Sequence, residues 1–492
     1  MTGYLLMVSL MIWPSLLLSQ HCESDYILEA KQAIFTLDTA TAGSCLELEL
    51  SANPANGYGY YYQNYLHFIK GLLFGGKAEY ERYLHFTANR LNSLRELNGN
   101  NPEYLFFLSS VNLQTSLLAF FNGDYWYGAK TFYIAHREIR QNQSIYPDYP
   151  GNRKIIGIME VLLSSIPENR EWLFDLLGMK GDRTGGLEKL KWYYADSDPR
   201  NRTESLLIYA LASVYYEEDP TRAFHELSVN QDIYLASPIF KYVYALSARV
   251  AGQPDEARKM LERVDTHKDG CRIPFTDLLL GEILLSDPGG GAIPYLKRFA
   301  DKYEGTNLKK AAWIRMSWYY YLEGEEGMYR YYRQLALTKG SSLLDQDKQA
   351  MSEAADTSEP NRLLLKARLL YDGNRYHESL NLLLGMEQDD LVSDMDRVEY
   401  PYRLARVYHA MGNVPEAKKY YRLVLDRGKS CPWYMVPYSA LQLAELYEND
   451  GDYAAAERYY TTCLEWKKYP YSGSIGSRAR EGLKRVADHL NE

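Results

Sequence analysis

The segment of this sequence closest to a ligand-binding motif is "GLLFGGKA", residues 71–78, which matches the first seven positions of the P-loop pattern GxxxxGK. A P-loop needs Ser or Thr at the next position to hold magnesium, and a strand before the glycines. Ala78 occupies the magnesium position, and residues 61–70 before it have a helical pattern. We therefore interpret the segment as a glycine turn between two helices.

Residues for other chemistry are present but are not grouped in known patterns. The nine histidines include no HExxH motif, and the sequence contains no GxSxG and no GxGxxG. The five cysteines contain no CxxC; they are Cys22, Cys45, Cys271, Cys431 and Cys463. Export would permit a Cys22–Cys45 bridge, and also a Cys431–Cys463 bridge, but the sequence assigns neither. We predict no catalytic residues, no metal site and no cofactor.

A repeated pattern defines the elements of the chain. "LARVYHAMGNVPEAKKYY" and "LAELYENDGDYAAAERYY" align without a gap, and "ALSARVAGQPDEARKML" has the same spacing. In all three, a small residue is followed after seven residues by Gly, after five more by Ala, and after four more by Tyr or Leu. The positions are Ala405, Gly412, Ala417 and Tyr421; Ala444, Gly451, Ala456 and Tyr460; and Ala245, Gly252, Ala257 and Leu261.

Each repeated position suits a pair of antiparallel helices. The small residue lets the second helix approach closely, and the Gly ends the first helix at φ > 0. Asp or Pro then opens the second helix. The pattern resembles the tetratricopeptide repeat (TPR), whose period is 34 residues. This resemblance implies an all-α fold, a right-handed α-solenoid of antiparallel helix pairs.

Weaker copies of the pattern extend the array along the chain. They include "SLLAFFNGDYWYGAKTF", "SWYYYLEGEEGMYRYY" and "KARLLYDGNRYHESLNLL". We expect an N-terminal degenerate array over residues 20–337, a polar hinge over 338–361, and a C-terminal array over 362–492. The tail from Ser474 reads as an amphipathic helix that caps the last repeat.

Residues 154–190 interrupt this pattern with an apolar run, Pro167 and "LLGMKGDRTGG". We read Lys154–Ser165 as one helix, a second ending at Gly178, and a third beginning in "GDRTGGLEKL". Locally this is similar to the tetratricopeptide repeat 39 family, a likeness that brings no catalytic residue. We interpret the segment as an unusually apolar helical pair; a docking surface that uses Trp172 and Phe174 is the alternative.

Composition limits the class of partner and the location. The net charge is −9 and the sequence has no run of Lys and Arg, so nucleic-acid binding is disfavoured. The apolar stretch from Tyr4 to Leu18 has the length of a signal-peptide core, and Ser19 provides a cleavage point. We expect a signal peptide at residues 1–19 and an exported, periplasmic or envelope-associated protein. An uncleaved N-terminus that anchors the chain to a membrane and a lipid anchor at Cys22 are the alternatives.

The remaining candidate site is the inner face of the solenoid. The resemblance implies that positions two, five, nine and twelve of each first helix contact a ligand. We therefore predict nine binding residues: Tyr242, Arg249, Trp318, Tyr321, Tyr402, Arg406, His409, Glu445 and Glu448. Aromatic residues interleaved with Arg are typical of binding hot spots.

These observations favour a non-catalytic exported scaffold that binds a protein or peptide in its groove, with a role in the cell envelope. A binder of small molecules or glycans is the second hypothesis, because the chain has 46 Tyr and 8 Trp for stacking. An enzyme with its site in an unrecognised insertion is the third.

Overall fold

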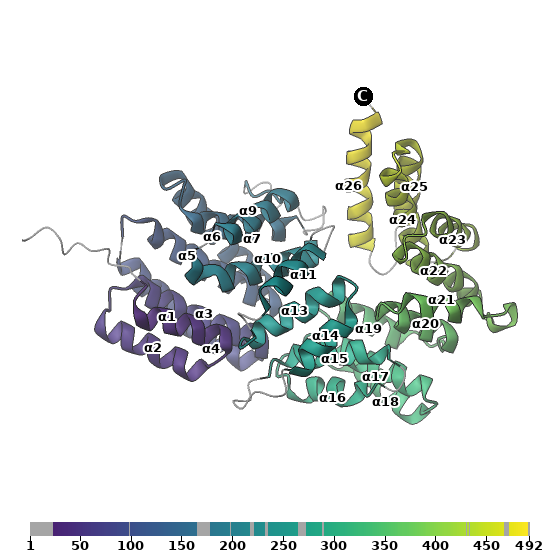
Figure 1. Cartoon of the computed structure of the whole chain (residues 1–492), viewed down its shortest axis with the longest axis horizontal. Coiled ribbons are helices and arrows are strands. Elements are labelled where there is room, and N and C mark those ends of the chain that lie inside the picture. The colour runs from purple at the N-terminus through teal and green to yellow at the C-terminus, as the bar shows by residue number, and fades with distance from the viewer. Residues whose placement is uncertain are drawn as a thin grey trace, which may run out of the picture. The chain divides into compact units, whose positions relative to one another are not determined.

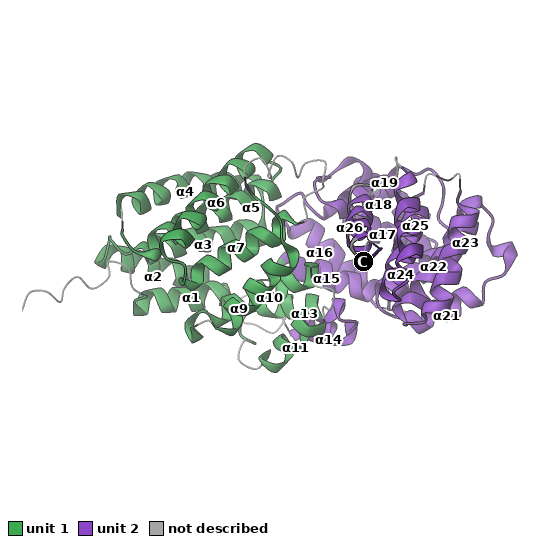
Figure 2. Ribbon diagram, turned by 90° about the horizontal axis from the view of Figure 1, so that it is seen from above, with its two compact units in different colours: residues 1–164, 179–247, 264–273 green, residues 165–178, 248–263, 274–492 purple. Residues whose placement is uncertain are grey.

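The computed structural model describes residues 23–97, 99–164, 178–196, 198–216, 221–231, 235–263, 272–287, 290–429, 431, 433–466 and 472–490. Over these residues the chain forms α-helices joined by short turns, as predicted, and no strand occurs among them (Figure 1). The chain divides into two compact units (Figure 2). Unit 1 comprises residues 1–164, 179–247 and 264–273, and unit 2 comprises 165–178, 248–263 and 274–492.

Unit 1 is built from helix pairs, and its helices that are not shared with unit 2 have these bounds: α1 (Asp25–Thr36), α2 (Thr39–Ala52), α3 (Gly57–Phe74), α4 (Lys77–Leu97), α5 (Pro102–Phe121), α6 (Tyr125–Ile145), α7 (Pro150–Leu163), α9 (Arg183–Ala195), α10 (Arg202–Tyr216) and α11 (Thr221–Val229). The P-loop-like segment is the turn between α3 and α4, where Gly75 and Gly76 have φ of 69° and 95°. In the described part of the chain, α5 alone is long and apolar enough to span a membrane, and 72% of its apolar window is buried inside the protein.

Unit 2 is also built from helix pairs, and the boundary between the two units falls inside α13 (Pro238–Val250). Its helices are α14 (Pro254–Glu262), α15 (Pro274–Leu285), α16 (Ala292–Lys302), α17 (Lys309–Leu322), α18 (Glu326–Thr338), α19 (Asp345–Ala355), α20 (Arg362–Asp372), α21 (Tyr376–Leu384), α22 (Asp394–Ala410), α23 (Val414–Arg427), α24 (Met435–Asn449), α25 (Tyr453–Glu465) and α26 (Ser472–Leu490). As predicted for the tail, α26 packs on α24 and α25 at the end of the array.

Residues 338–361, predicted to be a polar hinge, lie within unit 2 and contain α19. Asp347 is fully buried and accepts hydrogen bonds from the backbone N–H groups of Leu308 (2.6 Å) and Ala311 (3.1 Å) at the start of α17. Arg333 of α18 donates to the carbonyl of Ala354 at 3.1 Å. These bonds fix α19 to the helix pair that precedes it.

The turns inside the helix pairs follow the predicted chemistry. Gly412 and Gly451 have φ of 73° and 77° at the ends of α22 and α24. Asn413 and Asp452 then cap the next helix by accepting backbone N–H bonds of 3.4 Å and 3.1 Å. In the copy where Gly373 comes one residue early, Asn374 takes the left-handed conformation instead, at φ 59°.

The small residues lie at the helix crossings. Ala405, Ala417, Ala444 and Ala456 are fully buried. Gly157 of α7 approaches α9 so closely that a Cβ there would lie 3.0 Å from the carbonyl oxygen of Gly186. These approaches bring the two backbones of each pair together, as the repeat pattern predicts.

The high tyrosine content has a structural explanation in the helix pairs. A tyrosine four residues before the turn glycine stacks on a tyrosine twelve residues later, in three pairs of unit 2. Ring centroids are 5.5–5.6 Å apart and interplanar angles are 4–13° in the pairs Tyr320–Tyr332, Tyr408–Tyr420 and Tyr447–Tyr459. Stacked rings of this kind stabilise the pairing of the helices.

The apolar interruption at 154–190 is described only in part. α7 and α9 confirm the first and third predicted helices, and Gly178 has φ 72°, as expected of a helix end. Residues 165–177, with Trp172 and Phe174, lie outside the described residues.

Candidate functional site

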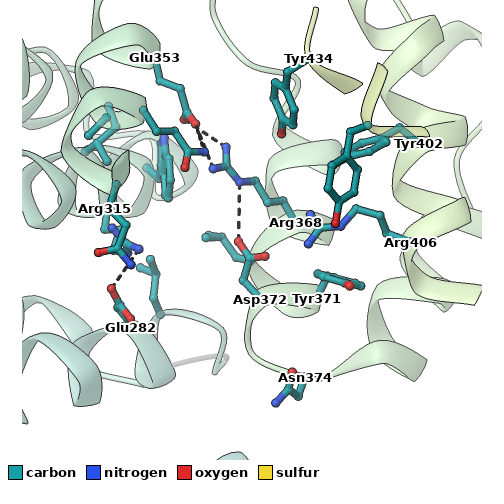
Figure 3. A pocket seen from close by; sticks show the side chains of 18 of the residues that line it. Glu282, Arg315, Glu353, Arg368, Tyr371, Asp372, Asn374, Tyr402, Arg406 and Tyr434 are labelled. Carbon is teal, nitrogen blue, oxygen red and sulfur yellow. Dashed lines mark hydrogen bonds and ion pairs between the residues drawn. The ribbon is translucent and has the colours of Figure 1, made fainter. Parts of the chain in front are cut away.

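A polar groove of about 620 Å³ lies along the inner face of unit 2 (Figure 3). The first helices of successive pairs line it, together with α19 and α26. The residues on which its chemistry depends are Arg249, Glu282, Arg315, Trp318, Glu353, Arg368, Tyr371, Asp372, Tyr402, Arg406 and Arg478. We call this set the polar groove.

The repeat places one residue of each first helix in this groove. It is the residue that directly follows the buried small residue at the helix crossing, so the approach of the second helix fixes its direction. Four such residues line the groove: Glu282, Trp318, Arg368 and Arg406. The next in the series, Glu445 after Ala444, binds the lining residue Arg478.

Glu282 forms a charge cluster at the α15 side of the groove. Its carboxylate binds Arg249 and lies 3.0 Å from Nη2 of Arg315. Burial raises the pKa of Glu282, but the two arginines outweigh burial and hold the pKa below its ordinary value. Two cations thus share this one carboxylate.

Arg368 is the most fully paired cation of the groove. It donates to both carboxylate oxygens of Glu353, at 3.0 Å and 3.1 Å, and lies 3.7 Å from Asp372 (Figure 3). Its guanidinium also lies 4.5 Å from the ring centroid of Trp318. Burial lowers the pKa of Arg368, and the two carboxylates outweigh that effect and raise it above its ordinary value. With two acidic partners, Arg368 has little capacity left for a ligand.

Arg406 differs from the other arginines of the groove. Its guanidinium lies 4.0 Å from the ring centroid of Tyr371 and 5.7 Å from that of Tyr402. Among the residues that the structure describes, no carboxylate forms an ion pair with it, and Figure 3 shows it between the two tyrosines. Burial lowers the pKa of Arg406, but the neighbouring tyrosines and Asp372 raise it, so the group stays charged. This arrangement can bind an anionic group of a ligand.

The nine predicted binding residues divide between the groove and its surroundings. Arg249, Trp318, Tyr402 and Arg406 line the groove together. Tyr321 packs in the core beside it and donates to the carbonyl of Pro360 at 2.8 Å.

The other four residues have different roles or positions. His409 lies 3.4 Å from the hydroxyl of Tyr421, Glu445 binds Arg478, and Glu448 binds Arg485 of the capping helix at 2.7 Å. Tyr242 belongs to unit 1. As a group they remain predicted binding residues.

Sequence reasoning missed several groove residues. Arg368, Tyr371 and Glu282 could have been found, because they occupy the ninth and twelfth positions of weaker repeat copies. Glu353 could not, because it comes from α19, which has no place in the repeat pattern.

The described part of the chain has neither a metal-binding cluster nor a pair of bonded cysteines. No cluster of three His, Cys, Asp or Glu side chains there could hold a metal ion. Cys431 and Cys463 are both free thiols, so the bridge considered between them is not formed. Cys45 is buried, and Cys22, with which a bridge was considered, lies outside the described residues.

Comparisons with known proteins agree with the helix pairs. Two tetratricopeptide repeat models match the chain, one over residues 399–427 and one over 439–470. These segments begin within α22 and α24 and include all of α23 and α25. No curated protein shows significant sequence similarity to the chain.

Similar solved structures include three helical proteins. The TPR domain of P58(IPK) has 13% identity, covers 82% of this chain and 94% of its own, and has a TM-score of 0.23. Yeast Tom70 has 13% identity, coverage of 95% and 91%, and a TM-score of 0.24. The Cut9–Hcn1 assembly of APC/C has 12% identity, coverage of 98% of each chain, and a TM-score of 0.24.

Because these identities and TM-scores are low, the assignment rests on the two repeat matches and on the geometry of the helix pairs. The small residues at the crossings and the positive-φ glycines at the turns are the features that such repeats require. Residues 399–427 and 439–470 of this chain are tetratricopeptide repeats, and the other described helix pairs share their architecture.

Proposed function

We propose that the protein is a non-catalytic scaffold whose polar groove binds a peptide segment of a protein partner, with an acidic side chain of that segment bound to Arg406. A TPR fold by itself favours a protein-interaction scaffold.

The state of Arg406 is the observation that supports this function most directly. A half-buried guanidinium that is stacked on tyrosines has donors left for a ligand, whereas Arg368 has two carboxylate partners. A carboxylate of the partner would form charge-assisted hydrogen bonds there, which contribute about 1.5–3 kcal/mol each. The half-buried ring of Tyr371 adds apolar contact area beside it, and the buried rings of Tyr402 and Trp318 support the wall of the groove.

The test uses defined peptides instead of an unidentified partner. A library of random peptides displayed on phage is selected against the full chain, and enriched peptides are measured by fluorescence anisotropy. We expect the selected peptides to contain Asp or Glu. Arg406→Ala should weaken their binding about 10- to 100-fold, the equivalent of about 1.5–3 kcal/mol.

Two controls make the result specific. Arg330→Ala removes an arginine whose side chain is 72% exposed on α18 and pairs only with Glu326 in the described structure; it should leave binding unchanged. The Asn or Gln analogue of each acidic peptide should bind the normal protein and the Arg406 variant equally. An equal loss for acidic and neutral peptides, or a library that yields no binder, would contradict the proposal.

We also propose that the protein is exported and acts in cell-envelope assembly or maintenance. The support is the apolar stretch from Tyr4 to Leu18 followed by Ser19. Mass spectrometry of the protein isolated from its own cells should find an N-terminus at Gln20 in the envelope fraction. An intact Met1 in the cytosolic fraction would contradict export.

A further inference from the structure

Unit 1 also has a hollow inner face, with a chemistry opposite to that of the polar groove. A cavity of about 360 Å³ lies among α3, α5, α7 and α10, with further lining residues from α1, α9 and α13. Its walls are almost entirely Leu, Ile, Val, Phe and Tyr side chains. This volume is within the range of pockets that hold small molecules, about 300–1,000 Å³.

The repeat explains why this face is apolar. As in unit 2, the residue that follows a small buried residue of a first helix points into the hollow. In unit 1 these residues are Leu72 after Gly71, Leu117 after Ser116, Ile158 after Gly157 and Leu211 after Ala210. All four are only half-buried, so the described residues leave apolar surface open to a ligand.

A small number of polar groups lies within these apolar walls. Lys154 and Glu204 form an ion pair with 2.6 Å between Nζ and Oε1, and their side chains are 5% and 6% exposed. Lys154 also donates to the hydroxyl of Tyr61 at 3.3 Å. The pair is already neutral overall, so an ionised ligand entering the cavity would lose its hydration without gaining a free counter-charge.

Ser110 provides the observation that points to a ligand. It lines the cavity and is 2% exposed, yet its Oγ has no hydrogen-bond partner among the described residues. An unsatisfied buried hydroxyl is costly and uncommon in native structures. A ligand with one hydrogen-bonding oxygen would satisfy it.

We propose that unit 1 binds a neutral, lipid-like molecule in this cavity: a hydrocarbon chain that carries a single hydroxyl group. The chain packs against the apolar walls, and the hydroxyl bonds to Ser110. This site is separate in chemistry from the peptide-binding groove and does not depend on the function proposed for it.

The test measures the binding of straight-chain alcohols to the full chain by isothermal titration calorimetry. Octanol, nonanol and decanol should bind at one saturable site. Each added methylene should tighten binding about fourfold, which corresponds to about 0.8 kcal/mol, until the cavity is full. Decanoate at pH 8 should bind at least tenfold more weakly than decanol, because its charge has no free partner in the cavity.

Two neighbouring serines supply a matched pair of variants. Ser110→Ala should weaken decanol binding about fivefold, the loss expected for one neutral hydrogen bond. Ser109→Ala should leave it unchanged, because Ser109 donates to the carbonyl of Ala135 at 2.8 Å and does not line the cavity. Ala212→Trp, which fills the cavity from α10, should abolish binding while circular dichroism shows an unchanged helix content.

Several results would overturn the proposal. Absence of saturable binding by any of the alcohols would remove the site, and unchanged binding to Ala212→Trp would place it elsewhere. Tighter binding of decanoate than of decanol would show that the ligand is anionic. An equal effect of the two serine substitutions would remove Ser110 from the site. The serine variants decide the question even if the Trp variant fails to fold.

Discussion

The buried ion pair Lys154–Glu204 gives the sharpest test of how unit 1 is stabilised. Its two side chains are 5% and 6% exposed, and the carboxylate and ammonium are in direct contact at 2.6 Å. Glu204→Gln would leave the ammonium buried without a counter-charge. Breaking one side of such a pair costs about 3–5 kcal/mol, which is a large fraction of the roughly 5–15 kcal/mol that stabilises a typical protein.

The double variant Lys154→Met with Glu204→Leu should behave in the opposite way. It replaces both charges with apolar side chains that suit the surrounding apolar walls. Substitution of a whole buried pair is commonly neutral or stabilising, by about 1–4 kcal/mol. We therefore expect the double variant to be at least as stable as the normal protein, although the single variant is strongly destabilised.

The pH dependence of the stability of Glu204→Gln provides an independent test of the same argument. In the normal protein, burial lowers the pKa of Lys154, but Glu204 outweighs burial and raises the pKa above its ordinary value of 10.5. Its stabilising contribution is therefore complete below pH 10.5 and is lost as the pH rises through the folded pKa. Without Glu204, burial should lower the pKa, so the variant should gain stability as the pH rises toward 10.5.

Hydrogen–deuterium exchange read by mass spectrometry resolves the effect within the full chain. Peptides from α7 and α10 should exchange faster in Glu204→Gln, and peptides from α24 and α25 in unit 2 serve as the internal reference. A loss of less than about 1 kcal/mol in the stability of α7 is the size expected for an exposed ion pair, and it would refute the argument that this pair is desolvated. A double variant as unstable as the single one would refute the argument equally.

Three further predictions concern single positions. Burial raises the pKa of Glu138 to about 7, so ionisation of its carboxyl group destabilises the protein as the pH rises from 4.5 to 7. Glu138→Gln should therefore increase the free energy of unfolding, measured in urea, by up to about 3 kcal/mol at pH 8. At pH 4 the same substitution should have almost no effect. Gly412→Ala meets no atom within 4 Å but must keep φ near 73°, so it should cost about 1–2 kcal/mol in the same assay, and Gly412→Asn less. Burial raises the pKa of Glu448, but Arg485 and Tyr460 outweigh burial and lower the pKa below its ordinary value. The ionised carboxylate should therefore keep α26 docked until the pH falls below 4.5. Hydrogen exchange of α26 should rise below that pH, and in Arg485→Ala it should already be faster at pH 7.

The sequence could predict what depends on local backbone geometry. The spacing of Ala405, Gly412 and Ala417 predicts a helix, a left-handed turn and a second helix, and each of these features is present. Such positions tolerate few residue types, because a Cβ or a larger side chain would clash at a crossing or strain a turn. The same constraint made the capping helix α26 predictable, since an apolar last face must be covered.

Long-range pairing could not be predicted in the same way. Nothing in the sequence around Arg368 indicates that Glu353, fifteen residues earlier, is its partner, because α19 lies outside the repeat pattern. Arg406 and Arg368 occupy the same repeat position and look equivalent in sequence. Only the structure shows that Arg368 has two acidic partners and that Arg406 stacks on two tyrosines.

The inner faces of the two units differ at one position of each repeat, the residue that follows the small residue at the crossing. The close approach of the second helix requires a small residue at the crossing. Because that residue faces the second helix, the residue after it faces the inner side of the unit. That residue faces the groove or the cavity, where Glu282 and Arg368 also bind side chains of neighbouring helices. In unit 2 these positions are Glu282, Trp318, Arg368, Arg406 and Glu445, whereas in unit 1 they are Leu72, Leu117, Ile158 and Leu211. Four of the five positions in unit 2 are charged and all four in unit 1 are aliphatic, a difference that matches the two ligands proposed above.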